Sequence, residues 1–339
     1  MSIIVILDIV LLIFLIIFLS YFSSNLRLID YPNDRKIHKG KIPLVGGIAI
    51  YISIIFAILF LEVHNWLIIL VFSSSVIVLF GALDDALQLG VSVRLISQFI
   101  AALVIVGSGL SIVDIGDYAL INPIELGMFA ILLTFLSVIG LTNAINFMDG
   151  IDGLASSLVF ISILSIYIFS IFDGGLTDGD FLILLLFNIL VFFLINIGWT
   201  PIRKIFLGDS GSTMLGFIVA WLLIYYAHPN IRSLHPVLTI WCVTIPVFDM
   251  ITVTIRRLSN KSNPFKPDRN HIHHILLDKG FSSKNVLFII VIFACSLNII
   301  GGFIYFWQGP FPALITYFLC FFLYFATNTL MQKKFISNN

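Results

Sequence analysis

The chain has 339 residues, of which 60% are hydrophobic and 11% are charged, and its 18 Lys and Arg balance its 18 Asp and Glu. A net charge of zero, without a basic stripe or tail, argues against nucleic-acid binding. The three cysteines, Cys242, Cys295 and Cys320, lie in apolar runs without metal-type spacing, so we interpret them as core residues.

Apolar runs that could cross a membrane recur along the whole chain. A spanning helix needs roughly 20 mostly apolar residues. We identify eleven candidate runs, at about 2–22, 46–61, 66–83, 95–113, 124–141, 154–172, 181–198, 212–227, 237–255, 286–306 and 310–330. The first run lacks the basic N-terminal region and the small-residue cleavage site of a signal peptide, so we predict a retained helix.

The charges give these runs an orientation. With the amino terminus outside, every Lys and Arg except Arg232 falls in or beside an inner segment, as the positive-inside rule requires. Eleven spans then place the carboxyl terminus, near Lys333 and Lys334, inside. We therefore predict an all-α polytopic integral membrane protein with about 11 transmembrane helices. It forms a single domain over residues 1–339, with its active site on inner segments 23–45, 84–94, 142–153, 199–212 and 256–285.

The first inner segment combines basic residues with a glycine pair. Lys36 and His38 lie in the run Asp34-Arg-Lys-Ile-His-Lys-Gly-Lys41, and Gly46-Gly47 follows. The cations suit a phosphate, and the glycines permit close approach of a ligand or a backbone. A membrane anchor followed by a turn explains the same residues.

Two adjacent carboxylates, Asp84 and Asp85, open the second inner segment at the end of an apolar run. They repel each other, oppose the negative end of the helix dipole and resist removal from water. A simple helix end would more naturally carry Lys or Arg. We therefore interpret the pair as functional, with either a cation partner or one protonated member.

In the third inner segment, Asn146, Asp149 and Asp152 recur at every third residue. On a helical or tightly turned backbone this spacing brings the side-chain oxygens toward one face. Such hard oxygens suit Mg²⁺, or hydrogen bonds to a ribose and a base. The glycines at 150 and 153 are equally compatible with a polar corner that binds nothing.

The fourth inner segment contains Gly208-Asp209-Ser210-Gly211 just before an apolar run. These letters suggest a serine protease, but nothing in the chain supplies the fold that a catalytic triad needs. A carboxylate at a helix entrance, with small residues that let a phosphate reach the N-terminal amides, fits better. Asp209 or Ser210 is also a candidate N-cap of that helix, and the two roles are compatible.

The fifth inner segment contains three histidines within four residues, His271, His273 and His274. Zinc binding is one interpretation, but the H-E-x-x-H spacing is missing and no Cys is near in sequence. We favour hydrogen bonds from the imidazoles to phosphate or sugar oxygens. Asp249, near the inner end of the ninth run, is expected to be functional or paired, with Arg256 or Arg257 as the nearby cations.

Taken together, the inner segments resemble those of the bacterial polyprenyl-phosphate N-acetylhexosamine-1-phosphate transferases, the superfamily of MraY, WecA and TagO. The resemblance covers essentially all inner segments in the same order. It rests on Asp84-Asp85, Asn146-x-x-Asp-Gly-x-Asp-Gly153, Gly208-Asp-x-Gly-Ser212 and His271-Ile-His-His274. Pro43-Leu-Val-Gly-Gly47, and the Ile at 272 where MraY proteins usually have histidine, place the chain with the WecA and TagO branch.

This resemblance implies transfer of N-acetylglucosamine-1-phosphate from UDP-GlcNAc to undecaprenyl phosphate, which yields undecaprenyl-pyrophosphoryl-GlcNAc and UMP. The reaction would initiate a cell-envelope polysaccharide at the cytoplasmic face of the bacterial inner membrane. The implied cofactor is Mg²⁺, with Mn²⁺ as a substitute, and the lipid bilayer is the setting. A homodimer, and a different UDP-N-acetylhexosamine as donor, are left open.

The resemblance also implies roles for individual residues. The expected catalytic residues are Asp84, Asp85 and Asp209, and the expected Mg²⁺ ligands are Asp209 and Asn146. Substrate contacts are expected from Lys36, His38, Asp149, Asp152, Asn196, His271, His273 and His274. Whether Asp84 or Asp85 acts on the acceptor phosphate or assists the metal is left open.

Two other functions fit the pattern less well. A secondary transporter would carry charged groups in mid-span and interrupted helices in repeated halves, whereas here the acids gather at one face and no repeat is visible. An intramembrane hydrolase that uses Ser210 or paired aspartates would need a deeper nucleophile with a base within reach.

Overall fold

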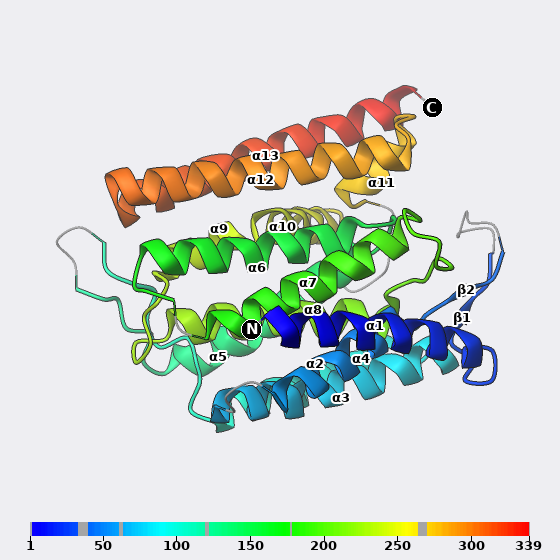
Figure 1. The fold of residues 1–339 in the computed structure, drawn as a ribbon. Helices are drawn as coiled ribbons and strands as arrows, with labels where there is room; N and C mark the ends of the chain where they lie inside the picture. Colours follow the sequence, from blue (N-terminus) through cyan, green and yellow to red (C-terminus); the bar gives the residue numbers. More distant parts are fainter. Residues whose placement is uncertain are drawn as a thin grey trace.

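Every apolar run predicted from the sequence coincides with a helix or a helix pair in the computed structural model of the chain (Figure 1). The structure describes residues 2–32, 40–60, 64–118, 122–176, 178–263 and 270–338. The elements are α1 (Ser2–Phe22), β1 (Ile29–Asp30), β2 (Ile42–Pro43), α2 (Gly46–Ile58), α3 (Asn65–Leu87), α4 (Val91–Gly107), α5 (Phe129–Phe147), α6 (Leu154–Phe172), α7 (Gly179–Asn196), α8 (Gly208–Ala227), α9 (Pro236–Cys242), α10 (Thr244–Ser259), α11 (Ile272–Asp278), α12 (Ser283–Gln308) and α13 (Pro310–Asn338).

Among the described residues, eight helices are long and apolar enough to cross a membrane: α1, α3, α5, α6, α7, α8, α12 and α13. The pair α9 and α10, bent by 79°, passes the same test when taken together. The helices α2, with 13 residues, and α4, with 17, are apolar but shorter. The protein is therefore a mostly helical, multi-pass membrane protein.

Several predicted runs differ in their bounds from the helices that form. The fourth run is expected at 95–113, whereas α4 spans Val91–Gly107. The fifth run was expected at 124–141, but α5 begins at Phe129 because Pro123 and Gly127, whose φ is +50°, precede it. The helix then continues through Asn143 and Asn146, whose side chains find hydrogen-bond partners. The ninth run breaks at Val243, which has non-helical dihedral angles.

The buried helix α8 lies against α2, α3 and α5 at the centre of the bundle. Glycines allow two of these neighbours to approach its first turn closely. A Cβ atom on Gly47 of α2 would overlap the backbone of Gly211, and one on Gly81 of α3 would overlap the backbone of Ser210. Small residues permit such close packing between membrane helices. The packing brings the end of α3, with its acid pair, beside the start of α8.

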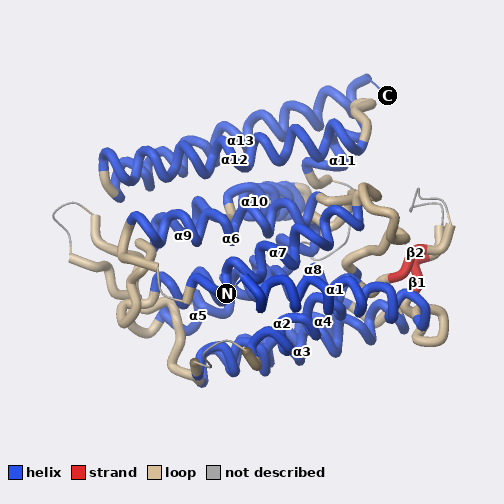
Figure 2. Tube along the Cα trace, in the orientation of Figure 1, coloured by secondary structure: helices blue, strands red, loops and turns tan. Residues whose placement is uncertain are grey.

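The inner segments gather at one end of the bundle. There β1 and β2 pair antiparallel, with Ile29 opposite Pro43, and Leu44 forms a parallel bridge with Phe206 (Figure 2). The short helix α11 lies at the same end, and α12 and α13 run as a pair along one edge of the bundle (Figure 1).

Candidate active site

The end of the bundle at which the predicted inner segments gather contains a cavity of about 1060 Å³. All five predicted inner segments contribute to its wall, the first of them through Asp30 and Tyr31. The residues singled out from the sequence that line it are Asp84, Asp85, Asp149, Asp152, Asn196, Asp209 and His274. The tertiary structure thus gathers polar side chains that are far apart in sequence.

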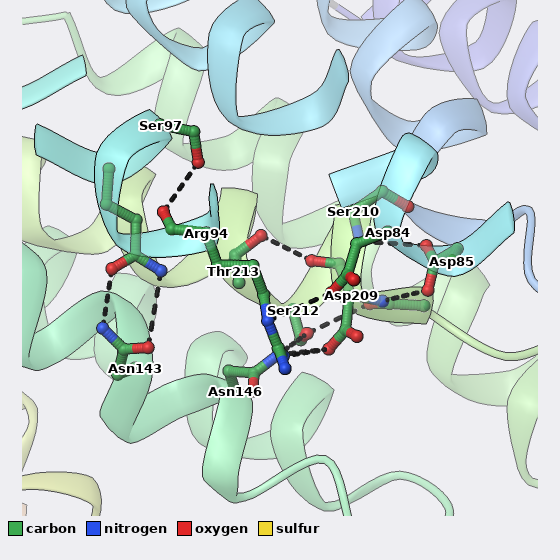
Figure 3. Close-up of polar contacts among 12 residues, drawn as sticks. Asp84, Asp85, Arg94, Ser97, Asn143, Asn146, Asp209, Ser210, Ser212 and Thr213 are labelled. Atoms are coloured by element: carbon green, nitrogen blue, oxygen red, sulfur yellow. Dashed lines mark hydrogen bonds and ion pairs between the residues drawn. The ribbon is translucent and has the colours of Figure 1, made fainter. Parts of the chain in front are cut away.

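Asp209 lies in the first turn of α8, where the positive end of the helix dipole stabilises a carboxylate. The preceding Gly208 has a φ of +77°, and a Cβ atom there would lie 2.6 Å from Asp85 Oδ2. Asn146, in the last turn of α5, donates from Nδ2 to Asp209 Oδ1 at 2.8 Å and to Ser212 Oγ at 2.8 Å (Figure 3). The structure therefore brings together the two residues expected to bind a metal.

Asp85 binds the N-terminus of the same helix. Its carboxylate accepts hydrogen bonds from the backbone N–H of Asp209 at 2.8 Å and of Ser210 at 3.1 Å, and such first-turn amides have no partner within their own helix. The expectation that Asp209 or Ser210 caps α8 is wrong, since Leu207 holds the N-cap position without a side-chain hydrogen bond. A phosphate could reach these two amides only by displacing Asp85.

Asp84 faces a different partner, because consecutive helix residues point about 100° apart. The Nε atom of Arg94, in the first turn of α4, lies 3.0 Å from Asp84 Oδ2, and its Nη1 lies 3.4 Å from Asp209 Oδ1 (Figure 3). The side chain of Asp84 is only 4% exposed. The cation partner expected for the acid pair is therefore Arg94, which joins Asp84 to Asp209.

The polar side chains of the third inner segment have different partners. Asn146 contacts α8, whereas Asp152 forms an ion pair with Lys204. Asp149 lines the cavity and is exposed there. Displacement of bulk water by the surrounding protein, together with the negative charges of nearby aspartates, raises the pKa of Asp149 to about 7. The regular spacing thus leads to three distinct environments.

Asn196, at the end of α7, holds the backbone with both ends of its amide. Its Oδ1 accepts the N–H of Gly153 at 2.7 Å, and its Nδ2 donates to the carbonyl oxygen of Ile205 at 2.8 Å. Asn196 also lines the cavity. The amide of Asn196 therefore joins two predicted inner segments. Its expected contact with substrate stays a prediction.

The three histidines form a row of rings beside the acidic residues. The ring centroids of His271 and Phe147 lie 5.0 Å apart, those of His271 and His273 6.1 Å, and those of His273 and His274 4.1 Å. His274 lines the cavity, and His273 lies so close to Gly150 that a Cβ atom there would overlap its ring.

Asp249 is paired, as expected, but its partner is the start of the histidine segment and not the nearby arginines that the sequence suggests. Its Oδ2 lies 2.6 Å from His271 Nδ1, and its Oδ1 accepts the N–H of Ile272 and the hydroxyl of Tyr324, each at 2.9 Å. These partners come from the histidine segment and from α13, whereas the sequence suggests Arg256 or Arg257 as the partner.

Comparison with known proteins identifies the family of the chain. The sequence model of glycosyl transferase family 4 matches residues 66–227. The undecaprenyl-phosphate alpha-N-acetylglucosaminyl 1-phosphate transferase of Escherichia coli K12 is 33% identical over 308 residues, which cover 89% of this chain and 84% of the relative. The chain belongs to glycosyl transferase family 4. This confirms the resemblance that the inner-segment motifs indicate.

Two further relatives of this family 4 transferase carry similar names. The undecaprenyl-phosphate alpha-N-acetylglucosaminyl 1-phosphate transferase of Salmonella typhi is 33% identical over 313 residues, which cover 89% of this chain and 84% of the relative. A probable undecaprenyl-phosphate N-acetylglucosaminyl 1-phosphate transferase of Bacillus subtilis is 32% identical over 264 residues, which cover 77% of this chain and 73% of the relative.

The matched region of the transferase, residues 66–227, runs from α3 to α8 and carries the acid pair and Asp209. The histidine segment and α13 follow it in the chain. Of the predicted substrate contacts, Lys36 and His38 lie outside the described residues, so their expected roles stay predictions.

Sequence reasoning missed two cations of the site. Arg94 is the single Lys or Arg between residues 84 and 94, and a comparison of charges within each inner segment would have singled it out beside two aspartates. Lys204 carried no comparable signal, because Arg203 precedes it and either residue fits the positive-inside pattern. Only the fold shows that Lys204 reaches Asp152.

Proposed function

We propose that this protein transfers N-acetylglucosamine-1-phosphate from UDP-GlcNAc to undecaprenyl phosphate, with release of UMP. Relatives that are 33% identical over most of their length are named for this transfer. The observation that carries the proposal is the cavity at one end of the membrane bundle, where Asp84, Asp209 and Arg94 meet. A lipid phosphate at the membrane surface and a soluble nucleotide sugar can both reach such a place.

The proposed topology has eleven spans, with the amino terminus outside and the cavity at the cytoplasmic face of the bacterial inner membrane. Eight helices and the bent pair α9–α10 support nine spans, and α2 and α4 would supply the other two. The distribution of Lys and Arg supports the orientation. We treat residues 1–339 as one transferase domain, because all five inner segments line one cavity.

We propose Mg²⁺ as the cofactor, with Mn²⁺ as a substitute. Among the described residues, no group of three or more His, Cys, Asp or Glu is arranged to hold a metal. Mg²⁺ commonly takes only one or two carboxylates and completes its shell with water and substrate phosphates. Asp84 and Asp209 converge on a single cation, the guanidinium of Arg94, so this donor set suits a cation. Asp209, with Asn146, would hold the ion.

The chemistry asks mainly for positioning and charge neutralisation. An oxygen of undecaprenyl phosphate attacks the β-phosphorus of UDP-GlcNAc, and the bond from that phosphorus to the oxygen retained by UMP breaks. Bound Mg²⁺ would offset the repulsion between the two anionic reactants. Asp85 holds the start of α8 so that Asp209 faces the cavity, and Arg94 balances the charge of Asp84 and Asp209.

The remaining contacts would bind the substrates. Asp149, Asp152 and Lys204 lie on the cavity wall, and Lys204 forms an ion pair with Asp152. We propose that Lys204 binds a substrate phosphate in place of the Asp152 carboxylate. We assign the nucleotide to this side, with Asn196. The histidines would contact phosphate or sugar oxygens, since His274 lines the same cavity.

Transfer of radiolabel from UDP-[¹⁴C]GlcNAc into butanol-extractable lipid, with and without Mg²⁺, tests the proposal. Purified protein offered undecaprenyl phosphate and a panel of UDP-amino sugars should turn over UDP-GlcNAc best. Preference for another UDP-N-acetylhexosamine would keep the reaction and replace the sugar. Preference for UDP-MurNAc-pentapeptide would overturn the branch, and no lipid product from any donor would overturn the reaction class.

A further inference from the structure

The inner half of α13 carries polar side chains at intervals of four residues, Tyr324, Asn328 and Gln332. Residues at this spacing share one face of a helix. Other side chains nearby, such as Phe322, Leu323 and Leu330, are apolar and exposed, as befits a helix at the edge of a membrane bundle (Figure 1). We call the three polar residues the α13 stripe.

Asn328 and Gln332 of the α13 stripe hold Asn270, the residue that precedes His271, directly or through Arg256. Gln332 donates from Nε2 to Asn270 Oδ1, and Asn328 Oδ1 accepts from Arg256 Nη1 at 2.8 Å. Arg256 also donates through Nη2 to the carbonyl oxygen of Asn270. The side chain and the carbonyl of Asn270 are therefore both held, one by α13 and one by an arginine that α13 also binds.

Tyr324 of the α13 stripe donates a hydrogen bond to the fully buried carboxylate of Asp249. Asp249 is 0% exposed, and burial of a charge is costly unless hydrogen bonds compensate it. Among the described residues, its hydrogen-bond partners are the His271 ring, the Ile272 N–H and the Tyr324 hydroxyl. All of them lie in the histidine segment or in the α13 stripe, so this carboxylate is placed to hold that segment.

The contact also bears on which nitrogen of His271 carries hydrogen. An ionised Asp249, which accepts two hydrogen bonds through Oδ1 and has Oδ2 2.6 Å from Nδ1, pairs with a ring that carries its hydrogen on Nδ1. The ring packs against Phe147, tilted by 32° at 5.0 Å between centroids, and lies nearly parallel to His273 at 6.1 Å. Phe147 follows Asn146 directly, so His271 is fixed relative to the acidic cluster.

We propose that Asp249, supported by Tyr324 of α13, is a positioning residue that orients His271 and keeps hydrogen on its Nδ1, so that Nε2 is left to accept a hydrogen bond. His271 itself is buried, and the neighbouring rings of His273 and His274 connect it to the cavity wall. This proposal rests on the proposed function, because that function assigns the histidine segment to substrate binding. It gives the last helix of the chain a part in the reaction.

Asp249→Asn is the central variant because it preserves size and one carbonyl oxygen. That oxygen can still accept from Ile272 and Tyr324, but the amide now donates to Nδ1 and moves the ring hydrogen to Nε2. Loss of an outer partner that orients a site histidine typically costs about 10- to 100-fold. We expect kcat/KM to fall by that amount while the melting temperature changes little.

A double-variant cycle with His271→Gln shows whether Asp249 acts through His271. If it does, adding Asp249→Asn to His271→Gln lowers the residual rate no further, because the group being positioned is already gone. Two independent roles would give losses that multiply, and that outcome would overturn the proposal.

A spectroscopic readout tests the tautomer without any activity measurement. In protein labelled with ¹⁵N-histidine, the signal that disappears in His271→Gln belongs to His271. We expect its Nδ1 to have the chemical shift of a protonated nitrogen in the wild type and of an unprotonated nitrogen in Asp249→Asn. An unprotonated Nδ1 in the wild type would contradict the proposed hydrogen bond.

Tyr324→Phe tests the contribution of α13, and Tyr317→Phe is its matched control. Both tyrosines lie on α13 with their rings near Phe248, at 5.7 and 4.9 Å between centroids. The Tyr317 hydroxyl is buried without a hydrogen-bond partner among the described residues. We expect Tyr324→Phe to lower kcat/KM about 3- to 10-fold, as one lost hydrogen bond permits, and Tyr317→Phe to stay within about twofold of the wild type.

Different results would contradict the proposed function and the positioning role of Asp249. A wild-type protein that forms no lipid product from any UDP sugar contradicts the proposed function, while the labelled histidine still reports on the Asp249 contact. An active wild type with an equally active Asp249→Asn overturns the positioning role. If Asp249→Asn does not fold, equal rates in Tyr324→Phe and Tyr317→Phe overturn it instead.

Discussion

Asp85 Oδ1 accepts the backbone N–H of Asp209 at 2.8 Å, so the end of α3 and the start of α8 are joined through a carboxylate. The neighbouring Asp84 turns toward Arg94 instead. Two adjacent acids that would repel each other thus have separate partners, one a helix N-terminus and the other a guanidinium. This division suggests that their substitutions will have different consequences.

Asp85→Asn should weaken the start of α8. The amide keeps one acceptor for a backbone N–H and places its own NH₂ against the other, so we expect a loss of about 0.5–2 kcal/mol in stability, as for other lost caps. Activity should fall at least about tenfold because Asp209 shifts. Melting temperature and rates at pH 7 and pH 9 check this, and recovery of a near-wild-type rate at pH 9 would identify Asp85 as a general base instead.

Asp209→Asn should abolish turnover at every Mg²⁺ concentration while the protein still folds. The substitution removes the carboxylate that faces both the cavity and Arg94, and neutral amides are weaker ligands for a hard cation. Asp180→Asn is a matched control, since Asp180 also lies in the first turn of a membrane helix, α7. Near-normal rates of Asp209→Asn across a Mg²⁺ titration would show that the metal assignment is wrong.

Arg94→Gln should destabilise the protein most in the absence of divalent cations. Without the guanidinium, Asp84 and Asp209 face each other uncompensated, and removal of one member of a largely buried ion pair is costly. We expect a lower melting temperature that Mg²⁺ partly restores, and a fall in activity. Arg203→Gln is the control, because Arg203 is exposed and donates only to the carbonyl oxygen of Lys41 among the described residues. Equal melting temperatures of the two variants would contradict this role of Arg94.

The raised pKa of Asp149 predicts a pH dependence near neutrality. Between about pH 4 and pH 7, the raised pKa keeps on Asp149 of the folded protein a proton that the unfolded chain, with a pKa of about 3.9, has lost. Its protonation therefore favours the fold at low pH, and this contribution disappears as the pH rises from about 4 through about 7. Binding of Mg²⁺ nearby favours the charged form, so Mg²⁺ affinity should rise between pH 6 and pH 8.

Calorimetric titration with Mg²⁺ at several pH values measures this linkage. The rise in affinity should flatten in Asp149→Asn and persist in Asp278→Asn, which removes another carboxylate from the cavity wall. The same slope in Asp149→Asn and the wild type would assign the titration to a different group.

Local properties of the chain were sufficient for much of the architecture. Run length and hydropathy located every helix or helix pair except the short α11, because a span is defined by its own residues and by the thickness of the bilayer. The position of each acid, amide and histidine on an inner segment followed from the same reading. Boundaries were less certain at α5, where Asn143 and Asn146 look like loop residues until their partners across the bundle are known.

Only the tertiary structure decided which residues form hydrogen bonds and ion pairs with one another. Asp85 and Asp209 are 124 residues apart, and Asp249 and Tyr324 are 75 apart. No local pattern encodes such pairs, since they depend on how closely whole helices pack, and Gly47 and Gly81 set that distance beside α8. The sequence alone therefore determined the helices and the chemical groups at their inner ends. Packing decided that Asp85 would cap a helix, that Arg94 would join two carboxylates, and that Tyr324 of α13 would bond the aspartate that contacts His271.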